Sequence, residues 1–160
     1  MSVLVVTAAK IQVGTAWTGT APGTPGTQTV SGTITSPTDI SSMLQQVAFP
    51  MTVATKDATN FAAGGYMINV PGLKAGNVTF LFNQDFAASQ TDVTIWSTLG
   101  LSTLAYVDIQ PAGGTRSATS PSYVFACYVT QYHPISTKVG DLVQVNVTWP
   151  ATGKFDRLTS

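Results

Sequence analysis

The residue types that could support nucleophilic catalysis are few in this 160-residue chain. Such catalysis needs a base within hydrogen-bond reach of a serine, threonine or cysteine. The one histidine, His133, stands before a proline at an expected strand end, where a surface or turn role is the simplest interpretation. The one cysteine, Cys127, lies in an apolar run and is expected to be a small buried side chain without an intrachain disulfide. Neither residue is expected to do chemistry.

Carboxylates, metal ligands and phosphate-binding loops give no stronger signal. All seven acidic residues are aspartates, and Asp85, Asp92 and Asp108 are the nearest candidates for a paired-carboxylate site. Their spacing places no two of them on one face of an element. The glycine-rich stretch Thr18–Gly26 contains prolines, which lack amide donors, and no Gly-Lys-Ser/Thr follows it. The sequence therefore predicts a protein that is not an enzyme and that holds no cofactor and no metal.

The composition is short of charge. Charged residues make up 9% of the chain, against about 25% in an average soluble domain. Apolar residues make up 44%, which is enough for a packed core and argues against disorder. Because the centres of interfaces are depleted in charge, we interpret much of this surface as covered by partner molecules. The alternative is a small β domain whose threonine, serine, asparagine and glutamine side chains supply the polarity.

The distribution of charge and hydropathy also bears on partners. The seven lysine and arginine residues are scattered, and tight binding to nucleic acid depends on clustered cations. The N-terminal apolar run Val3–Val6 is too short for a secretion signal. No stretch approaches the roughly 18 apolar residues of a membrane-spanning helix. We therefore expect neither tight binding to nucleic acid nor insertion of this chain into a membrane.

Alternation of apolar and polar residues dominates the chain and is typical of half-buried strands. Clear examples are the runs 9–17, 47–53 and 143–149. Val78, Phe80 and Phe82 alternate in the same way after two expected turns, at Pro71–Gly72 and Ala75–Gly76. The pattern predicts a mainly β fold of about eight strands, arranged as one β-sandwich or barrel that comprises residues 1–160.

One short α-helix is expected on the flank of this sandwich, at about 87–99. Asp85 is a suitable N-terminal cap. Phe86, Val93, Trp96 and Leu99 are expected along one side of the helix. The threonine and serine content makes the segment a weak helix former, so packing against the sheet must hold it.

The last long strand separates its side chains into two chemically different faces. Val143, Val145, Val147 and Trp149 point one way, and Gln144, Asn146 and Thr148 point the other. The second set is neutral and polar, which suits a wall that touches another subunit or lines a wet channel. The alternative is an ordinary solvated sheet face, although such a face would more often carry lysine and glutamate.

Several separated segments resemble the major tail tube proteins of long-tailed (siphovirus-type) bacteriophages. The segments that carry this resemblance are Asp39–Ser42, Phe61–Lys74, Val70–Asp85, Asn83–Ala88, Ser120–Tyr123, Tyr132–Ile135 and Val139–Pro150. Their order and spacing make the match, which spans roughly residues 27 to 152.

The resemblance implies a structural virion protein that self-assembles. Subunits of this family form six-membered rings, and the rings stack into a hollow tube through which the phage DNA passes as non-specific cargo. The resemblance implies further partners among other tail proteins at the tube ends, a location in the phage tail, and synthesis in the bacterial host cytoplasm. The rival hypothesis is a monomeric module that binds a ligand or a carbohydrate.

The resemblance also assigns particular residues to contacts between subunits. Residues 1–8 and 151–160 are possible arms that reach a neighbouring subunit. The residues assigned to an inter-ring stacking loop are Asp57, Ala58, Thr59, Asn60, Phe61, Gly64 and Gly65.

Overall fold

The computed structural model describes residues 8–24, 29–135, 137–138 and 140–160, and these residues form a mainly β structure. The predicted fold class is confirmed, with ten strands in the described part of the chain where about eight were expected. The strands are β1 (Lys10–Gly14), β2 (Trp17–Thr20), β3 (Ser31–Ile34), β4 (Thr38–Asp39), β5 (Leu44–Ala48), β6 (Met51–Asp57), β7 (Asn69–Asn83), β8 (Leu104–Gln110), β9 (Ser122–Tyr128) and β10 (Gln144–Leu158).

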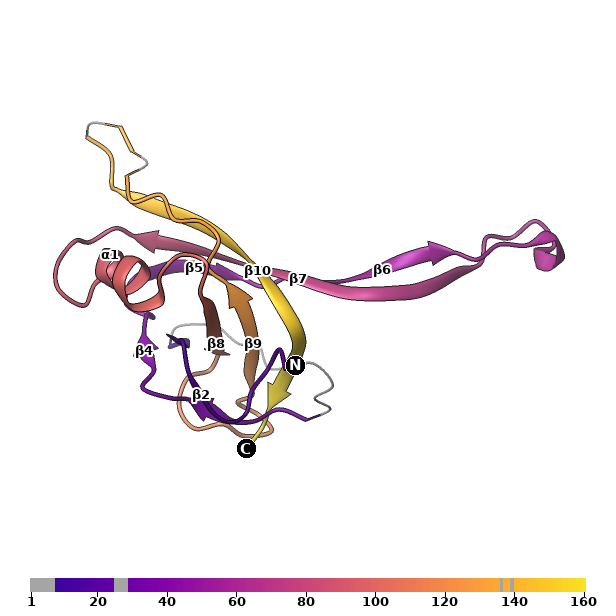
Figure 1. Ribbon diagram of the computed structural model, residues 1–160, viewed down its shortest axis with the longest axis horizontal. Coiled ribbons are helices and arrows are strands. Elements are labelled where there is room, and N and C mark those ends of the chain that lie inside the picture. The colour runs from indigo at the N-terminus through magenta and orange to yellow at the C-terminus, as the bar shows by residue number, and fades with distance from the viewer. Residues whose placement is uncertain (1–7, 25–28, 136, 139) are drawn as a thin grey trace.

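The main sheet is antiparallel and strongly curled (Figure 1). Its strand order is β4-β1-β8-β9-β10-β7-β5, and β6 pairs with the part of β7 that extends beyond this path. Strand β10 belongs to both halves of the curl. Residues Gln144–Pro150 pair with β7, whereas Ala151–Leu158 pair with β9 across a register shift between Thr152 and Asp156. A bulge of this kind bends a strand and increases its twist, so β10 carries the sheet from one layer into the other.

The core fills the concave side of the curled sheet. The alternating residues of β10 and β7 face each other there in the pairs Val145↔Phe82, Val147↔Phe80 and Trp149↔Val78. All six of these side chains are buried. The Phe80 and Trp149 rings meet edge to face, with their centroids 5.3 Å apart, which is a favourable aromatic geometry. The alternation read from the sequence therefore identifies this part of the core correctly.

The helical segment is shorter than predicted and wound differently. The α-helix α1 contains only Thr91–Val93 and continues as the π-helix η2 (Thr94–Leu99), so the segment begins at residue 91 and not at 87. The N–H of Gly100 donates to the carbonyl of Ile95, five residues earlier. The buried residues of the segment are Thr91, Thr94, Ile95 and Leu99. Phe86 and Trp96 are exposed, so the prediction that they share a packed side with Leu99 is wrong.

A hydrogen-bond network ties this helical segment to the chain that follows β9. The Tyr132 hydroxyl donates to Asp92 Oδ1 at 2.9 Å and accepts from Gln84 Nε2 at 2.7 Å. Gln84 Nε2 also donates to the carbonyl of Pro134. Burial raises the pKa of the Tyr132 hydroxyl to about 12, so the hydroxyl remains a donor at neutral pH. These contacts hold the helix where its own propensity would not.

The chain between residues 49 and 76 leaves the body as a long hairpin. Strand β6 pairs with the first part of β7 from Met51↔Gly76 to Asp57↔Asn69, and Figure 1 shows both strands projecting far beyond the curled sheet. The turns predicted at Pro71–Gly72 and Ala75–Gly76 are wrong, because both pairs lie inside β7. Before Asn77, β7 pairs with β6 alone, so Pro71 sits in a region where a strand tolerates a missing N–H at its open edge.

The buried position of Cys127 leads to a prediction about its reactivity. Its side chain is fully buried in the core, and burial raises the pKa of the thiol from 9.0 to about 12. Because the thiolate is the reactive form, iodoacetamide at pH 8 should modify Cys127 only after denaturant unfolds the protein. The free energy of unfolding should also fall as the pH rises from 9 towards 12, since the unfolded thiol ionises first.

Mass spectrometry after alkylation with and without denaturant measures the first effect, and a Cys127→Ala variant is the control for the second. Rapid labelling of the native protein would show that β9 opens readily.

Candidate functional site

The residues considered for catalysis have structural roles. Asp85 Oδ1 accepts from the N–H of Ala87 at 2.8 Å, and Asp92 accepts from Tyr132. Asp108 is buried in β8, where its Oδ2 pairs with Arg116 at 2.6 Å. Among the described residues there is no group of three or more histidine, cysteine and carboxylate side chains that could hold a metal ion. No helix in that part of the chain is long and apolar enough to cross a membrane.

The residues assigned to a stacking loop lie together at the tip of the β6–β7 hairpin (Figure 1). Asp57 ends β6, and its carboxylate accepts from the N–H of Thr59 at 2.8 Å. Hydrogen bonds from Thr59 hold the pKa of this carboxylate below its usual value. A single 3₁₀ turn, η1 (Phe61–Ala63), follows. The segment is thus a hairpin tip with its own short helical turn.

Local hydrogen bonds order this tip, although no other segment among the described residues covers it. Asn60 Oδ1 accepts from the N–H of Ala62 at 2.9 Å and caps η1. Thr59 Oγ1 accepts from the N–H of Ile68 across the tip at 2.9 Å. Gly64 and Gly65 have φ values of 60° and 87°, a left-handed conformation that favours glycine, and they reverse the chain. The Phe61 side chain is left fully exposed on this ordered turn.

The whole hairpin presents apolar side chains to its surroundings. Its exposed large apolar residues are Met51, Val53, Phe61, Tyr66, Met67, Ile68, Val70 and Leu73. An isolated two-stranded hairpin is marginally stable in water. A large exposed apolar surface commonly marks an interaction site. The hairpin therefore has the properties of an arm that packs against another molecule.

The candidate neutral face of the last strand lies on the side of the sheet that is turned away from the core. Gln144, Asn146 and Thr148 alternate with the buried Val145, Val147 and Trp149 in the first half of β10. Thr148 Oγ1 lies 3.0 Å from Thr79 Oγ1 on the neighbouring strand β7, and Gln144 Nε2 donates to Gln45 Oε1. This face lies on β10, which pairs with the second part of β7, whereas the first part of β7 belongs to the hairpin. The hairpin tip and the neutral face are therefore separate surfaces.

Residues 151–160 were considered as a possible arm. Ala151–Leu158 form the second half of β10 and pair with β9, so this segment is built into the sheet. Residues 1–7 lie outside the described residues.

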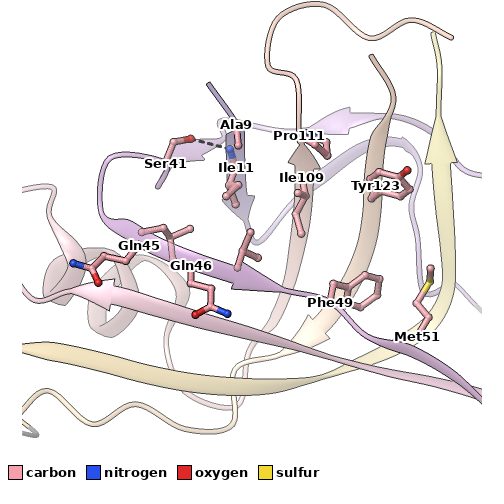
Figure 2. Close-up of a pocket in the computed structure, with 12 residues that line it drawn as sticks. Ala9, Ile11, Ser41, Gln45, Gln46, Phe49, Met51, Ile109, Pro111 and Tyr123 are labelled. Carbon is pink, nitrogen blue, oxygen red and sulfur yellow. Dashed lines mark hydrogen bonds between the residues drawn. The ribbon is translucent and has the colours of Figure 1, made fainter. Parts of the chain in front are cut away.

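Sequence reasoning missed an open groove where the curled sheet fails to close. We call it the seam groove; Figure 2 shows it between β5 on one side and β1, β8 and β9 on the other. Its volume is about 830 Å³, and its apolar lining includes Ile11, Leu44, Val47, Phe49, Ile109 and Pro111. None of its 12 lining side chains carries a formal charge. The lining comes from separate segments of the chain, so no local pattern in the sequence could reveal it.

Two hydrogen bonds join β1 to the segment before β5 beside the seam groove. The N–H of Ile11 donates to Ser41 Oγ at 2.8 Å, and the N–H of Ile40 donates to the carbonyl of Ile11 at 2.9 Å. Among the described strands, β5 is the last in the sheet order and pairs with β7 alone. Its second edge therefore faces the groove with backbone groups that another chain could reach.

Comparison with known proteins establishes the fold. No protein-family model and no curated protein sequence matches the chain. Among solved structures, a chain of the sheath/tube terminator of an extracellular contractile injection system (PVC, extended state) has 11% identity and a TM-score of 0.56, with 99% of this chain and 98% of that chain covered. A chain from the baseplate of the anti-feeding prophage has 10% identity and a TM-score of 0.56, covering 99% and 97%.

A third similar chain comes from the virion of a native gene transfer agent particle. It has 11% identity and a TM-score of 0.53, with 75% of this chain and 87% of that chain covered. The present chain has the fold of these three chains. Identities this low establish the fold alone.

Proposed function

We propose that this protein is a structural subunit of a phage-type tail tube. In this proposal six copies form a ring, rings stack into a hollow tube, and phage DNA passes through the lumen. The protein is made in the bacterial cytoplasm and resides in the virion, where other tail proteins contact the tube ends. The observation that carries the proposal is the exposed apolar β6–β7 hairpin on a body that has the fold of tail components.

The neutral face supports a role in the wall of a channel. DNA slides past a surface that does not hold its phosphates, because clustered cations would bind it. Gln144, Asn146 and Thr148 contribute polar side chains without charge, and the paired residues Asn83, Leu81 and Thr79 of β7 are uncharged as well. A lumen with this face would stay wet and would not bind DNA tightly.

The hairpin supports a role in contacts between rings. It projects from the body (Figure 1), and local hydrogen bonds hold its tip in the single chain. A contact surface that is already ordered loses less conformational entropy on binding. Asp57, Ala58, Thr59, Asn60, Phe61, Gly64 and Gly65 form this tip.

Electron microscopy of the purified protein tests the proposal. We expect rings or tubes about 100 Å across in negative stain, on the order of six domains of this size around a channel, with six-fold class averages viewed down the axis. Light scattering at increasing concentration should show a mass that grows beyond the 16.7 kDa of one chain. A monomer at every concentration would refute self-assembly and favour the rival, a monomeric ligand- or carbohydrate-binding module.

A further inference from the structure

We propose that the seam groove of one subunit receives the tip of the β6–β7 hairpin from a second copy, with Phe61 as the buried anchor. This inference rests on the proposed function, since it requires copies of the chain to assemble. It adds the site that receives the hairpin tip, and this site is built from several separate segments of the chain. Four features favour a second copy as the partner. They are the reach of the hairpin, the polarity of the tip and the groove, the shapes of these two surfaces, and the place where the hairpin leaves the body.

The tip of the hairpin cannot enter the seam groove of its own subunit. Strands β6 and β7 are paired as far as Asp57↔Asn69, which keeps the tip at the end of the arm. Figure 1 shows this arm pointing away from the curled sheet that contains the groove. No described residue outside the hairpin covers the exposed tip, which leaves it free to bind another molecule.

The two surfaces match in polarity. Asp57, where β6 ends, is the one charged residue of the tip, and residues 58–73 beyond it contain no charged side chain; the lining of the seam groove contains none either. A charge that loses water without gaining a partner costs several kcal/mol, so a charged surface on either side would oppose docking. Two neutral and largely apolar surfaces avoid that penalty and gain from burial.

The shape of the hairpin tip suits the shape of the seam groove. Phe61 stands on the 3₁₀ turn that Asn60 caps, so one large aromatic side chain projects from a narrow tip. Aromatic residues that fill pockets dominate the energetics of many interfaces. The groove volume of about 830 Å³ lies in the range of about 300–1,000 Å³ that is typical of binding pockets. The unpaired edge of β5 can supply hydrogen bonds to backbone groups of the entering tip.

The hairpin leaves the body at Met51, and we call this point the hairpin root. Its position allows the contact to repeat from copy to copy. Phe49 and Met51 line the seam groove, and Met51 is also the first residue of β6. A tip that enters the groove therefore lies beside the root of the receiving copy's own hairpin. Such a head-to-tail contact uses two different surfaces and leaves one of each free, so it repeats from copy to copy.

Disulfide cross-linking tests the proposal with the intact protein. The variant A62C/M51C places one cysteine beside the anchor and one in the groove, and leaves Phe61 in place. The matched control A62C/W96C moves the second cysteine to the helical segment at the other end of the body. Met51 is 59% exposed and Trp96 is 60% exposed, so the two positions are equally accessible, and the native Cys127 is buried.

Under mild oxidation, A62C/M51C should give a ladder of covalent oligomers on a non-reducing gel. The yield should exceed that of A62C/W96C by roughly tenfold, because a disulfide forms only where Cα atoms come within about 7 Å. Electron microscopy of the same samples before oxidation shows whether particles form.

Each outcome separates this inference from the proposed function. Particles together with the ladder from A62C/M51C support both. Particles without that ladder, or with a ladder from A62C/W96C in its place, overturn the groove as the receiving site and leave the tube proposal standing. No particles and no ladder overturn both.

Discussion

A protein in which residues 59–67 are replaced by Asn-Gly is expected to fold normally and to lose its ability to form tubes. The N–H of Ala58 donates to the carbonyl of Ile68 at 2.8 Å, so a two-residue turn closes the hairpin on a pair that already exists. Asn-Gly is the preferred sequence for such a turn. The replaced residues contact no part of the core, so the thermal midpoint should change little.

The expected loss of assembly is large because the replacement removes the exposed aromatic and apolar side chains of the tip. Truncating one aromatic anchor typically costs about 2 kcal/mol or more, which is roughly a 30-fold weaker contact. Phe61→Ala alone should therefore raise the concentration needed for assembly by about 30-fold. Sedimentation across a concentration series measures this threshold, and circular dichroism measures the midpoint.

Leu142→Ala is the matched control for Phe61→Ala. Leu142 is an exposed large apolar residue outside the hairpin, so its truncation removes similar surface without touching the tip. An unchanged threshold for Phe61→Ala, or an equal rise for Leu142→Ala, would contradict a specific role for the tip.

The sequence predicts the core strands well because their periodicity reports a real asymmetry of environment. Phe80, Phe82, Val145 and Val147 alternate with polar residues because one face of the sheet packs and the other does not. The same argument does not hold before Gly76, in the part of β7 that projects from the body together with β6. The described residues bury neither face of the hairpin, so no alternation is required there. Pro71–Gly72 and Ala75–Gly76 then resemble turns although they lie inside a strand.

The prediction for the helical segment failed for a different reason. The side chains that pack, Thr91, Thr94, Ile95 and Leu99, recur at the spacing of one helical face. Two of them are threonines, which a pattern of apolar residues does not include, whereas the apolar Phe86 and Trp96 are exposed. Apolar spacing therefore identified the wrong face of the helix.

The sequence predicts only some of the candidate assembly surfaces. The tip residues were assigned by resemblance, and the structure gathers them at the end of one arm. The seam groove depends on where β5 and β1 stop approaching each other, which is set by the curl of the whole sheet. The partner of Asp108 was missed as well, because Arg116 lies in a polar loop with no periodic signal.

Arg116→Ala is expected to destabilise the subunit by about 3–5 kcal/mol, because it leaves a buried carboxylate without its charge partner. Asp108 is buried on β8, and Arg116 Nη2 lies 2.6 Å from its Oδ2. The other carboxylate oxygen, Asp108 Oδ1, has no hydrogen-bond partner among the residues that the structure describes. Arg116 Nη1 also donates to the carbonyl of Gly32 at 2.9 Å, so the same side chain fastens β3 over β8.

Chemical denaturation of Arg116→Ala measures the loss, and two further variants show its cause. Lys74→Ala removes one positive charge from an exposed position on the hairpin, and should change the free energy of unfolding by less than about 1 kcal/mol. The double variant Asp108→Leu/Arg116→Met replaces the ion pair with apolar groups. It should recover most of the stability, since the cost arises from an unpaired buried charge and not from loss of the pair itself.

The two large effects separate folding from assembly. Arg116→Ala should lower the stability of the body and reduce assembly only by depleting folded subunits, so stabilising conditions should restore tubes. The Asn-Gly replacement should abolish assembly at unchanged stability, and no stabilising condition should restore it. If Arg116→Ala costs no more than Lys74→Ala, Asp108 is hydrated in solution and β3 does not cover it. If the Asn-Gly variant unfolds, the hairpin tip contributes to the fold of the body as well as to contacts beyond it.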